Sequence, residues 1–380
     1  MYLNKLKFLV SFLLVVTCWQ QAGAAIVPAA PDIDATAYLV MDYNSGRILA
    51  EKEIDKRVEP ASLTKMMTTY VVTNEIDEGN IKMGDLVMIS EKAWRMEGSR
   101  MFVEVNKQVT VEELLKGVII QSGNDASVAL AEHIAGTEEV FAEVMNQYAA
   151  KLGMANTHFT NSTGLPDPNH YTTARDLSLL SSAMIRDHPD IYVWHSQKEF
   201  MFNGITQPNR NLLLWRDNSV DGIKTGHTET AGFCLVSSAV REDMRLITVV
   251  MGSASMESRA RGSGALLNFA FRFFETHKLY SPGEMITTSP IWKGETDTLN
   301  LGVNEEVWVT VPRGQYKQLK PVTEFEPTII APVSSGAVLG KVKFMLDTEE
   351  LASRPLVALE AINEGSIIDR VKDEVRLFLQ

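Results

Sequence analysis

The stretch "EPASLTKMMTTYVV", from Glu59 to Val72, places a serine three residues before a lysine at the start of an apolar, Met-rich segment. Residues three apart lie on one face of a helix, so a helix here makes Ser62 and Lys65 neighbours. A serine hydroxyl attacks only beside a base, and lysine is a base when burial or a second cation favours its uncharged form. The stretch therefore predicts a Ser62 nucleophile that is activated by Lys65.

A second segment, "QSGNDAS", places Ser122 and Asn124 between two predicted helices. The Ser122 hydroxyl can relay a proton to a leaving amine, and the Asn124 amide can bond both a lysine and a substrate carbonyl. Taken alone, each segment has a plainer reading: a helix cap followed by a solvated lysine, and a turn between helices. We predict that both belong to one catalytic site.

A third segment, "DGIKTGHT", lies at the entry to a β-rich run. The exposed edge of a strand can hold an extended peptide by main-chain hydrogen bonds. Lys224 is expected to lower the pKa of Lys65 as a second cation, and Thr225 to bond a carboxylate. Gly226 is expected to let a ligand approach the backbone closely. The plainer reading is a turn at a strand end with a solvated lysine.

The pattern of strands and helices predicts an α+β fold, in which helices pack on an antiparallel sheet. Residues 36–53 read as two strands joined at Asn44-Ser45-Gly46, and "GFCLVSSAVRE" and "MRLITVVMGS" read as two more near residues 232–253. Helical patterns fill the middle of the chain and return at residues 261–279. We therefore expect a sheet assembled from both ends of the segment 25–282.

A boundary is predicted at Pro282, after which short alternating runs indicate a small all-β domain at residues 283–362. Residues 363–380 form an amphipathic pattern, with apolar side chains such as Ile367 and Phe378 on one face. This segment is too short and too charged to span a bilayer, and we expect it to lie on a membrane surface. The alternative is a helix packed on the β domain or on a partner.

The first 24 residues have the three parts of a secretory signal peptide: basic Lys5 and Lys7, an apolar stretch, and a small-residue cleavage site at 22–24. Removing them takes the formal net charge from −12 to −14, which disfavours a nucleic-acid partner. Cys234 is the one cysteine that remains after cleavage, so no internal disulfide is expected. The seven histidines show no metal-binding spacing, and neither a metal nor a cofactor is expected.

The three segments occur in one order, with Ser122 60 residues after Ser62 and Lys224 a further 102 residues on. This set is typical of penicillin-binding proteins and class A β-lactamases. With "YLVMDYNSGRILAE", "FRFFE", the β-rich segment and the amphipathic tail, the chain resembles the low-molecular-mass penicillin-binding proteins that are D-alanyl-D-alanine carboxypeptidases of the Gram-negative envelope. One departure is the segment Trp94–Met101, which looks shorter than the corresponding loop of that family.

The resemblance implies acyl transfer on peptidoglycan stem peptides, with β-lactams as substrate mimics. Ser62 would attack, Lys65 would take its proton, and Ser122 would protonate the leaving D-alanine. Backbone N–H groups of Ser62 and His227 would form the oxyanion hole. The resemblance further implies a substrate-binding set at the terminal carboxylate, in which Arg261 is an alternative to Arg259: Lys224, Thr225, Gly226, His227, Thr228 and Arg259. Arg210 also matches a family arginine, whose role the resemblance does not specify.

Three alternatives use the same residues differently. A β-lactamase needs a glutamate that activates the deacylating water, whereas Asp167 is the sole acid between Phe159 and Tyr171. An endopeptidase would cut peptidoglycan cross-links, and a non-catalytic envelope scaffold would have no need of the intact motifs. The expected location is the periplasm, with the chain attached peripherally to the inner membrane through residues 363–380.

Overall fold

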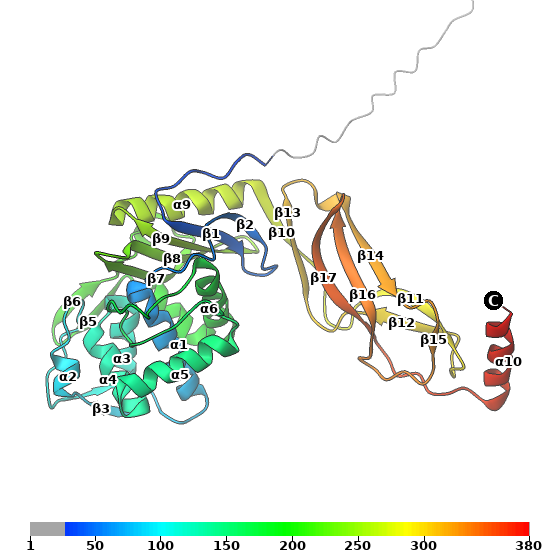
Figure 1. The fold of residues 1–380 in the computed structure, drawn as a ribbon, viewed down its shortest axis with the longest axis horizontal. Coiled ribbons are helices and arrows are strands. Elements are labelled where there is room, and N and C mark those ends of the chain that lie inside the picture. Colours follow the sequence, from blue (N-terminus) through cyan, green and yellow to red (C-terminus); the bar gives the residue numbers. More distant parts are fainter. Residues whose placement is uncertain (1–26, 380) are drawn as a thin grey trace, which may run out of the picture.

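The computed structural model describes residues 27–379, so the predicted signal peptide at residues 1–24 lies outside the described part of the chain. Figure 1 shows a large body of helices around a sheet, then an elongated β-rich body, then one terminal helix. The predicted α+β architecture is confirmed. Within residues 27–379, no helix is both long enough and apolar enough to cross a bilayer.

A five-stranded antiparallel sheet runs through the large body in the order β2-β1-β9-β8-β7. Strand β1 pairs with β9, which places Ala37 opposite Met251 and confirms a sheet built from both ends of the segment. The sheet leaves β7 at one edge, where one side of its backbone has no neighbouring strand of this sheet. The strands are β1 (Ala37–Asp42), β2 (Ile48–Lys52), β7 (Val220–Thr228), β8 (Gly232–Arg241) and β9 (Met244–Ser253).

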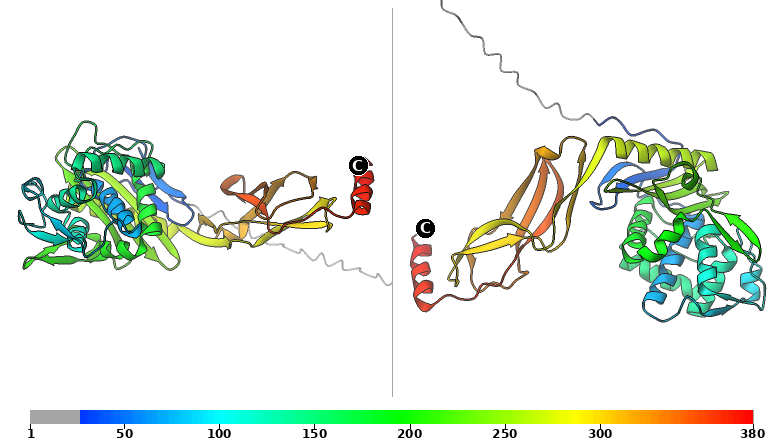
Figure 2. Two further views of the ribbon diagram at one scale, coloured as in Figure 1. Left: turned by 90° about the horizontal axis from the view of Figure 1, so that it is seen from below. Right: turned by 180° about the vertical axis from the view of Figure 1, so that it is seen from behind.

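Helices cover both faces of this sheet (Figure 2). Alternate residues of β1 point to opposite faces of the sheet. Leu39 belongs to the larger apolar cluster, on the face covered by most of the helices, and Val40 belongs to the smaller one, which includes residues of α9 (Met256–Phe273). On the larger side, α6 contacts β9 and β1, and α1 lies among α4, α5 and α6. These helices are α1 (Thr64–Asp77), α3 (Val111–Lys116), α4 (Asn124–Ala135), α5 (Glu138–Lys151) and α6 (Ala174–Asp187).

Short elements complete the large body around these helices. The β3–β4 and β5–β6 pairs are antiparallel two-stranded ribbons outside the main sheet, and a short turn joins β5 to β6. Their bounds, with those of the short helices, are β3 (Leu86–Met88), α2 (Glu91–Trp94), β4 (Gln108–Thr110), α7 (Pro189–Tyr192), η3 (Val193–Ser196), β5 (Glu199–Phe202), β6 (Ile205–Pro208) and α8 (Leu213–Arg216).

The helix predicted at residues 261–279 ends early, at Phe273, and the expectation for its last residues is wrong. The chain continues directly as strand β10 (Phe274–Tyr280), because this segment pairs with β13 (Val307–Pro312) instead of continuing the helical hydrogen bonds. The division at Pro282 stays a prediction. The pairing of β10 with β13 favours a change of body at Phe274.

The second body is β-rich, as its alternating runs predicted. A sheet in the order β14-β16-β17-β12-β11-β15 encloses an apolar cluster that includes Leu299, Phe344 and Leu356. Its elements are β11 (Met285–Trp292), β12 (Thr298–Gly302), η4 (Tyr316–Gln318), β14 (Leu319–Phe325), β15 (Ile329–Ile330), β16 (Val338–Leu346) and β17 (Glu349–Ala358). Helix α10 (Ile367–Phe378) follows, at the end farthest from the large body in Figure 1.

Candidate active site

Ser62 lies in a short 3₁₀ turn, η1 (Ala61–Leu63), that leads directly into α1. Two glycines from distant segments press against this turn. A Cβ atom on Gly226 would lie 3.0 Å from the carbonyl oxygen of Pro60, and one on Gly164 would lie 1.8 Å from that of Ala61. Backbone packing therefore fixes the turn, which presents the partly buried Ser62 side chain to a pocket.

The Lys65 side chain is completely buried one turn behind Ser62. Its Nζ lies 3.1 Å from Ser62 Oγ, 2.7 Å from Asn124 Oδ1 and 2.6 Å from the carbonyl oxygen of Thr163. A charged lysine has three N–H donors, and these three acceptors match them. When Lys65 is uncharged, its lone pair can instead accept the Ser62 proton across the same 3.1 Å contact.

Ser122 and Lys224 meet on another side of the same pocket. Ser122 follows the π-helical turn η2 (Gly117–Gln121) and has a left-handed backbone, with φ of 66°. Lys224, on β7, is buried, and its Nζ donates to Ser122 Oγ at 2.8 Å. A non-glycine residue at positive φ is held there by its surroundings, so the fold aims the Ser122 hydroxyl at Lys224.

Asn124 begins α4 and connects Lys65 to the segment that contains Glu97. Its Oδ1 accepts from Lys65, and its Nδ2 donates to the carbonyl oxygen of Glu97 at 2.6 Å. These two contacts fix which way the amide points, with the oxygen toward Lys65. The three motifs that were recognised in the sequence therefore converge on one place in the structure.

The edge strand β7 forms another wall of the pocket. Thr225 is nearly buried, whereas the His227 side chain is exposed and its ring lies 3.9 Å from that of Phe233. Thr228 Oγ1 accepts from the backbone N–H of Ala231 at 2.9 Å and donates over a longer 3.5 Å contact to Glu59 Oε2. The strand edge can therefore offer both backbone and hydroxyl hydrogen bonds to an extended ligand.

Arg259, on α9, completes this wall. Its Nη1 donates to the carbonyl oxygens of Gly226 and Cys234, at 2.9 and 3.2 Å. Burial is the main cause that lowers the pKa of Arg259 to about 10, so the guanidinium keeps its charge at neutral pH. Arg261 is exposed and does not line the pocket, so Arg259 is the arginine in position to meet an anion there.

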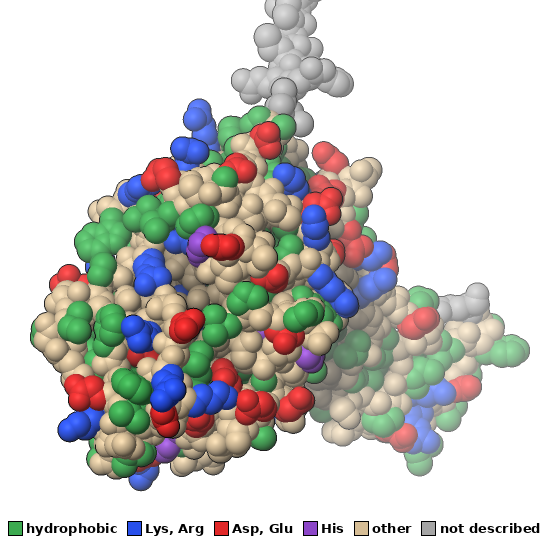
Figure 3. Space-filling view, turned by 60° about the vertical axis from the view of Figure 1, so that its left-hand side comes forward, with side chains coloured by type: hydrophobic (Ala, Val, Ile, Leu, Met, Phe, Trp, Pro, Cys, Tyr) green, Lys and Arg blue, Asp and Glu red, His purple; other side chains and the backbone are tan. Residues whose placement is uncertain are grey.

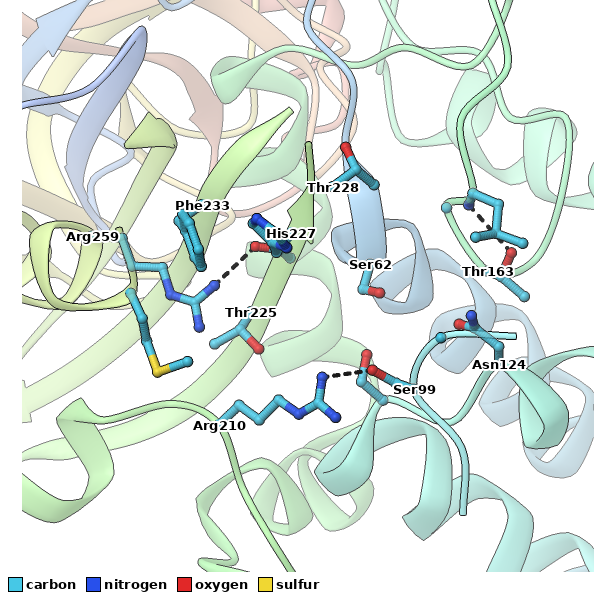
Figure 4. Close-up of a pocket in the computed structure, with 16 residues that line it drawn as sticks. Ser62, Ser99, Asn124, Thr163, Arg210, Thr225, His227, Thr228, Phe233 and Arg259 are labelled. Atoms are coloured by element: carbon cyan, nitrogen blue, oxygen red, sulfur yellow. Dashed lines mark hydrogen bonds between the residues drawn. The ribbon is translucent and has the colours of Figure 1, made fainter. Parts of the chain in front are cut away.

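The pocket enclosed by these groups has a volume of about 460 Å³. Figure 4 shows Ser62 between two sides, with Phe233, His227 and Arg259 on one and Asn124 and Thr163 on the other. Figure 3 shows that basic, acidic and apolar side chains are interspersed over one face of the large body. The pocket is lined by Ser62, Gly98, Ser99, Ser122, Asn124, Thr163, Gly164, Leu165, Arg210, Thr225, Gly226, His227, Thr228, Phe233, Met256 and Arg259.

Comparison with known proteins identifies the family. A family model described as D-alanyl-D-alanine carboxypeptidase matches residues 24–255, and one described as the C-terminal domain of penicillin-binding protein 5 matches residues 274–364. The D-alanyl-D-alanine carboxypeptidase DacC of Escherichia coli is 46% identical over 356 residues, which cover 92% of this chain and 89% of the relative. The chain belongs to the D-alanyl-D-alanine carboxypeptidase family.

Two further relatives agree with this assignment. The carboxypeptidase DacA of Escherichia coli is 44% identical over 361 residues, covering 93% of this chain and 89% of the relative. The crystal structure of penicillin binding protein 5 from Haemophilus influenzae matches with a TM-score of 0.86 and 44% identity, over 89% of this chain and all of that chain. The protein is therefore a serine-type D-Ala-D-Ala carboxypeptidase with a cell-wall function, as the resemblance of its sequence implied.

The environment of Lys65 in this carboxypeptidase favours a basic amine. Burial lowers the pKa of Lys65 to about 7, and the positive charge of Arg210 is the second cause. The carboxylates of Asp125 and Glu138 act in the opposite direction. Above pH 7 most Lys65 side chains are therefore uncharged and can accept a proton from Ser62.

A cation that was not expected also acts on Lys65. Lys224 was predicted as the second positive charge, and the two lysines repel each other, because the charge of Lys65 is one cause that lowers the pKa of Lys224. Arg210, which lines the pocket, is a further cation that lowers the pKa of Lys65. Lys224 is itself buried, and burial together with nearby cations lowers its pKa well below the usual value. An arginine far from the three motifs has no sequence signal for this effect, apart from the family resemblance.

Two other features of the site were not foreseen. Gly226 was expected to let a ligand approach, but the close contact it permits is with Pro60 and the Ser62 turn of the carboxypeptidase itself. The third acceptor for Lys65 is the carbonyl oxygen of Thr163. Every residue carries such a carbonyl, so nothing in the sequence marks this one.

We expect Gly164→Ala to unfold more easily by about 3 kcal/mol and to lose activity. Gly164 has φ of +83°, and an added Cβ would meet the Ala61 carbonyl oxygen at 1.8 Å, so both strain and a backbone clash arise. Urea unfolding monitored by circular dichroism measures the loss. Gly153→Ala is the matched control, because Gly153 has φ of +76° but nothing within 4 Å of the added atom. Equal losses in both variants would contradict packing against the Ser62 turn.

Proposed function

We propose that the carboxypeptidase removes the terminal D-alanine from peptidoglycan stem pentapeptides through an acyl-enzyme on Ser62. The observation that carries this proposal is the 3.1 Å contact between Ser62 Oγ and the buried Nζ of Lys65, a base with a pKa of about 7. In this mechanism Ser62 attacks the carbonyl between the two D-alanines while Lys65 takes its proton. The backbone N–H groups of Ser62 and His227 stabilise the oxyanion.

Departure of D-alanine needs a proton for its amine. Ser122 supplies this proton and recovers it through Lys224, which supports the proposal by lying 2.8 Å from Ser122 Oγ. The terminal carboxylate of the peptide binds where Thr225, Thr228 and Arg259 face the pocket. Gly226 and His227 lie between them on the edge strand, and their backbone groups align the peptide. Water then releases the shortened peptide from Ser62.

β-Lactams acylate Ser62 as mimics of the D-Ala-D-Ala bond, and the acyl group persists because, within residues 27–379, the lining of the pocket includes no carboxylate side chain. Asp167 does not line the pocket, and its carboxylate accepts from the backbone N–H of Asn169 at 2.8 Å. The nearby Glu138 is committed to Ser162 and to Lys92, outside the pocket lining. These contacts favour a penicillin-sensitive carboxypeptidase over a β-lactamase.

The proposed function is tested with a peptide that ends in D-Ala-D-Ala and with penicillin. The carboxypeptidase is expected to release free D-alanine, and mass spectrometry of the penicillin adduct is expected to place the label on Ser62. A label on another residue, or D-alanine release without any acylated serine, would contradict the acyl-enzyme mechanism.

We further propose that the chain works in the periplasm, attached to the inner membrane through α10. Exposed apolar side chains form one face of this helix, from Ile367, which is 77% exposed, to Phe378, which is 90% exposed. The opposite face holds the helix to the β-rich body, because Asp373 accepts from the backbone N–H of Lys293 at 2.8 Å and Lys293 also pairs with Glu374. This arrangement leaves the apolar face turned outward, as an interfacial helix requires.

Phe378→Asp is expected to weaken binding to anionic lipid vesicles by at least about tenfold, because it replaces a large exposed apolar side chain with a charge. Co-sedimentation with vesicles measures the effect, and removal of residues 367–380 is expected to abolish binding. The control is Lys372→Gln, a change on the polar face that should reduce binding far less. Unchanged vesicle binding after removal of residues 367–380 would refute the membrane proposal.

A further inference from the structure

The segment 97–103, which we call the 97–103 loop, contains no helix or strand, yet it holds two groups of the site in place. The carbonyl oxygen of Glu97 accepts from Asn124 Nδ2 at 2.6 Å, and that of Ser99 accepts from the Asn124 backbone N–H at 2.7 Å. Ser99 Oγ accepts from Arg210 Nη1 at 2.6 Å. The loop thus bridges the residue that bonds Lys65 and the arginine that lowers the pKa of Lys65.

The side chain that holds this loop is Asp125. Its carboxylate accepts from three successive backbone N–H groups, those of Met101 at 3.0 Å, Phe102 at 2.9 Å and Val103 at 3.2 Å. It also accepts from the N–H of Ala126 at 2.9 Å, and it is only 1% exposed. A buried carboxylate with four N–H donors is a strong anchor for an otherwise irregular segment.

The neighbouring glycines make room for this arrangement. A Cβ atom on Gly123 would lie 2.8 Å from Asp125 Oδ1 and 3.2 Å from the backbone nitrogen of Met101. A Cβ atom on Gly117 would lie 2.4 Å from the Met101 sulfur. A larger side chain at Gly117 or Gly123 would therefore push the 97–103 loop out of position. Asp125 is the polar group that holds the loop against these glycines.

We propose that Asp125 is a positioning residue for acylation. It fixes the 97–103 loop, which in turn holds Asn124 against Lys65 and keeps the Arg210 guanidinium in its place in the pocket. Asp125 does not line the pocket, and therefore it acts through these two residues without touching substrate. The inference rests on the proposed roles of Ser62 and Lys65. It adds a residue to which neither the three motifs nor the family resemblance assigned a role.

Positioning and simple charge predict opposite shifts for the Asp125→Asn variant. The asparagine NH₂ cannot accept from Phe102 and Val103, so the loop is released, and with it the Arg210 charge that lowers the pKa of Lys65. Loss of the Asp125 charge alone would instead lower that pKa, because the carboxylate raises it. The charged and titratable groups that act on Lys65 or respond to it are Arg210, Asp125, Glu138, Lys224 and His170.

The test is the second-order rate of acylation by penicillin, measured from pH 5 to 9 for the wild type and Asp125→Asn. We expect the plateau rate to fall by about a hundredfold, because displacing a catalytic group by about 1 Å has that effect. The acid limb of the profile is the range in which the acylation rate rises with pH as Lys65 loses its proton. We also expect this acid limb to move to higher pH. A limb that moves to lower pH, or stays in place, would overturn the proposal.

Two further variants keep the test decisive if Asp125→Asn folds poorly. Ser99→Ala removes the contact with Arg210 and leaves the Asp125 contacts intact, so a smaller shift of the acid limb in the same direction is expected. Asp176→Asn is the matched control, because Asp176 is also buried and accepts from the N–H of Asn156 at 2.8 Å, but its hydrogen bonds do not reach the 97–103 loop. Its acid limb should not move, and an equal shift there would overturn the proposal.

Failure of this inference is distinguishable from failure of the proposed function. If penicillin does not acylate the wild type, that result refutes the proposed function itself. If the wild type is acylated on Ser62 and neither Asp125→Asn nor Ser99→Ala moves the acid limb upward, the inference alone is refuted.

Discussion

A Ser62→Ala variant is expected to release no D-alanine above background and to take up no penicillin. The Ser62 oxygen is the atom that would form the acyl bond, and it lies 3.1 Å from Lys65 Nζ at the edge of the pocket. Removing the nucleophile of a serine hydrolase lowers kcat by about 10⁶-fold. D-Alanine is measured by a coupled oxidase assay, and acylation by a fluorescent penicillin on a gel.

A matched control for this change is Ser178→Ala. Ser178 is a buried serine whose hydroxyl donates to the carbonyl oxygen of Arg175 within α6, away from the pocket. Its D-alanine release and penicillin uptake should equal those of the wild type. Appreciable turnover by Ser62→Ala would mean that another group attacks the peptide.

The second large effect is expected for Lys65→Arg, which should lower the rate of acylation by about 10⁴-fold. A guanidinium stays protonated at any working pH and cannot take the Ser62 proton. The wild-type rate is expected to rise as the pH passes through about 7, because the uncharged form of Lys65 is the active base. In the variant this rise should disappear, which stopped-flow acylation at several pH values measures directly.

Lys116→Arg provides the control for the lysine change. Lys116 pairs with Glu112 on the surface of α3, and an arginine preserves that pair. Its pH profile should match that of the wild type. If Lys65→Arg kept both the rate and the pH dependence, a base other than Lys65 would have to activate Ser62.

Local sequence patterns were sufficient for much of the fold. The alternating and apolar runs near residues 37–53 and 232–253 correctly indicated strands of the central sheet. Side chains of a strand that face a packed helical layer have to be apolar, and this requirement leaves a recognisable pattern in the sequence. The helix predicted at residues 261–279 was displaced along the chain, because the observed helix begins at Met256 and ends at Phe273. Residues 274–280 mix apolar with polar and charged side chains and show no decisive period, and their pairing with β13 decided in favour of a strand.

The chain's own sequence determined which chemistry the site carries: a serine and a lysine one turn apart, with the Ser122 and Lys224 motifs downstream. Only the tertiary structure decided what surrounds them, namely the Thr163 carbonyl at Lys65, Arg210 as the neighbouring cation, and Arg259 in preference to Arg261. The physical reason is how far apart the contacting residues lie along the chain. Residues one helical turn apart are neighbours by local geometry, whereas a carbonyl 98 positions away reaches Lys65 only when the whole body folds.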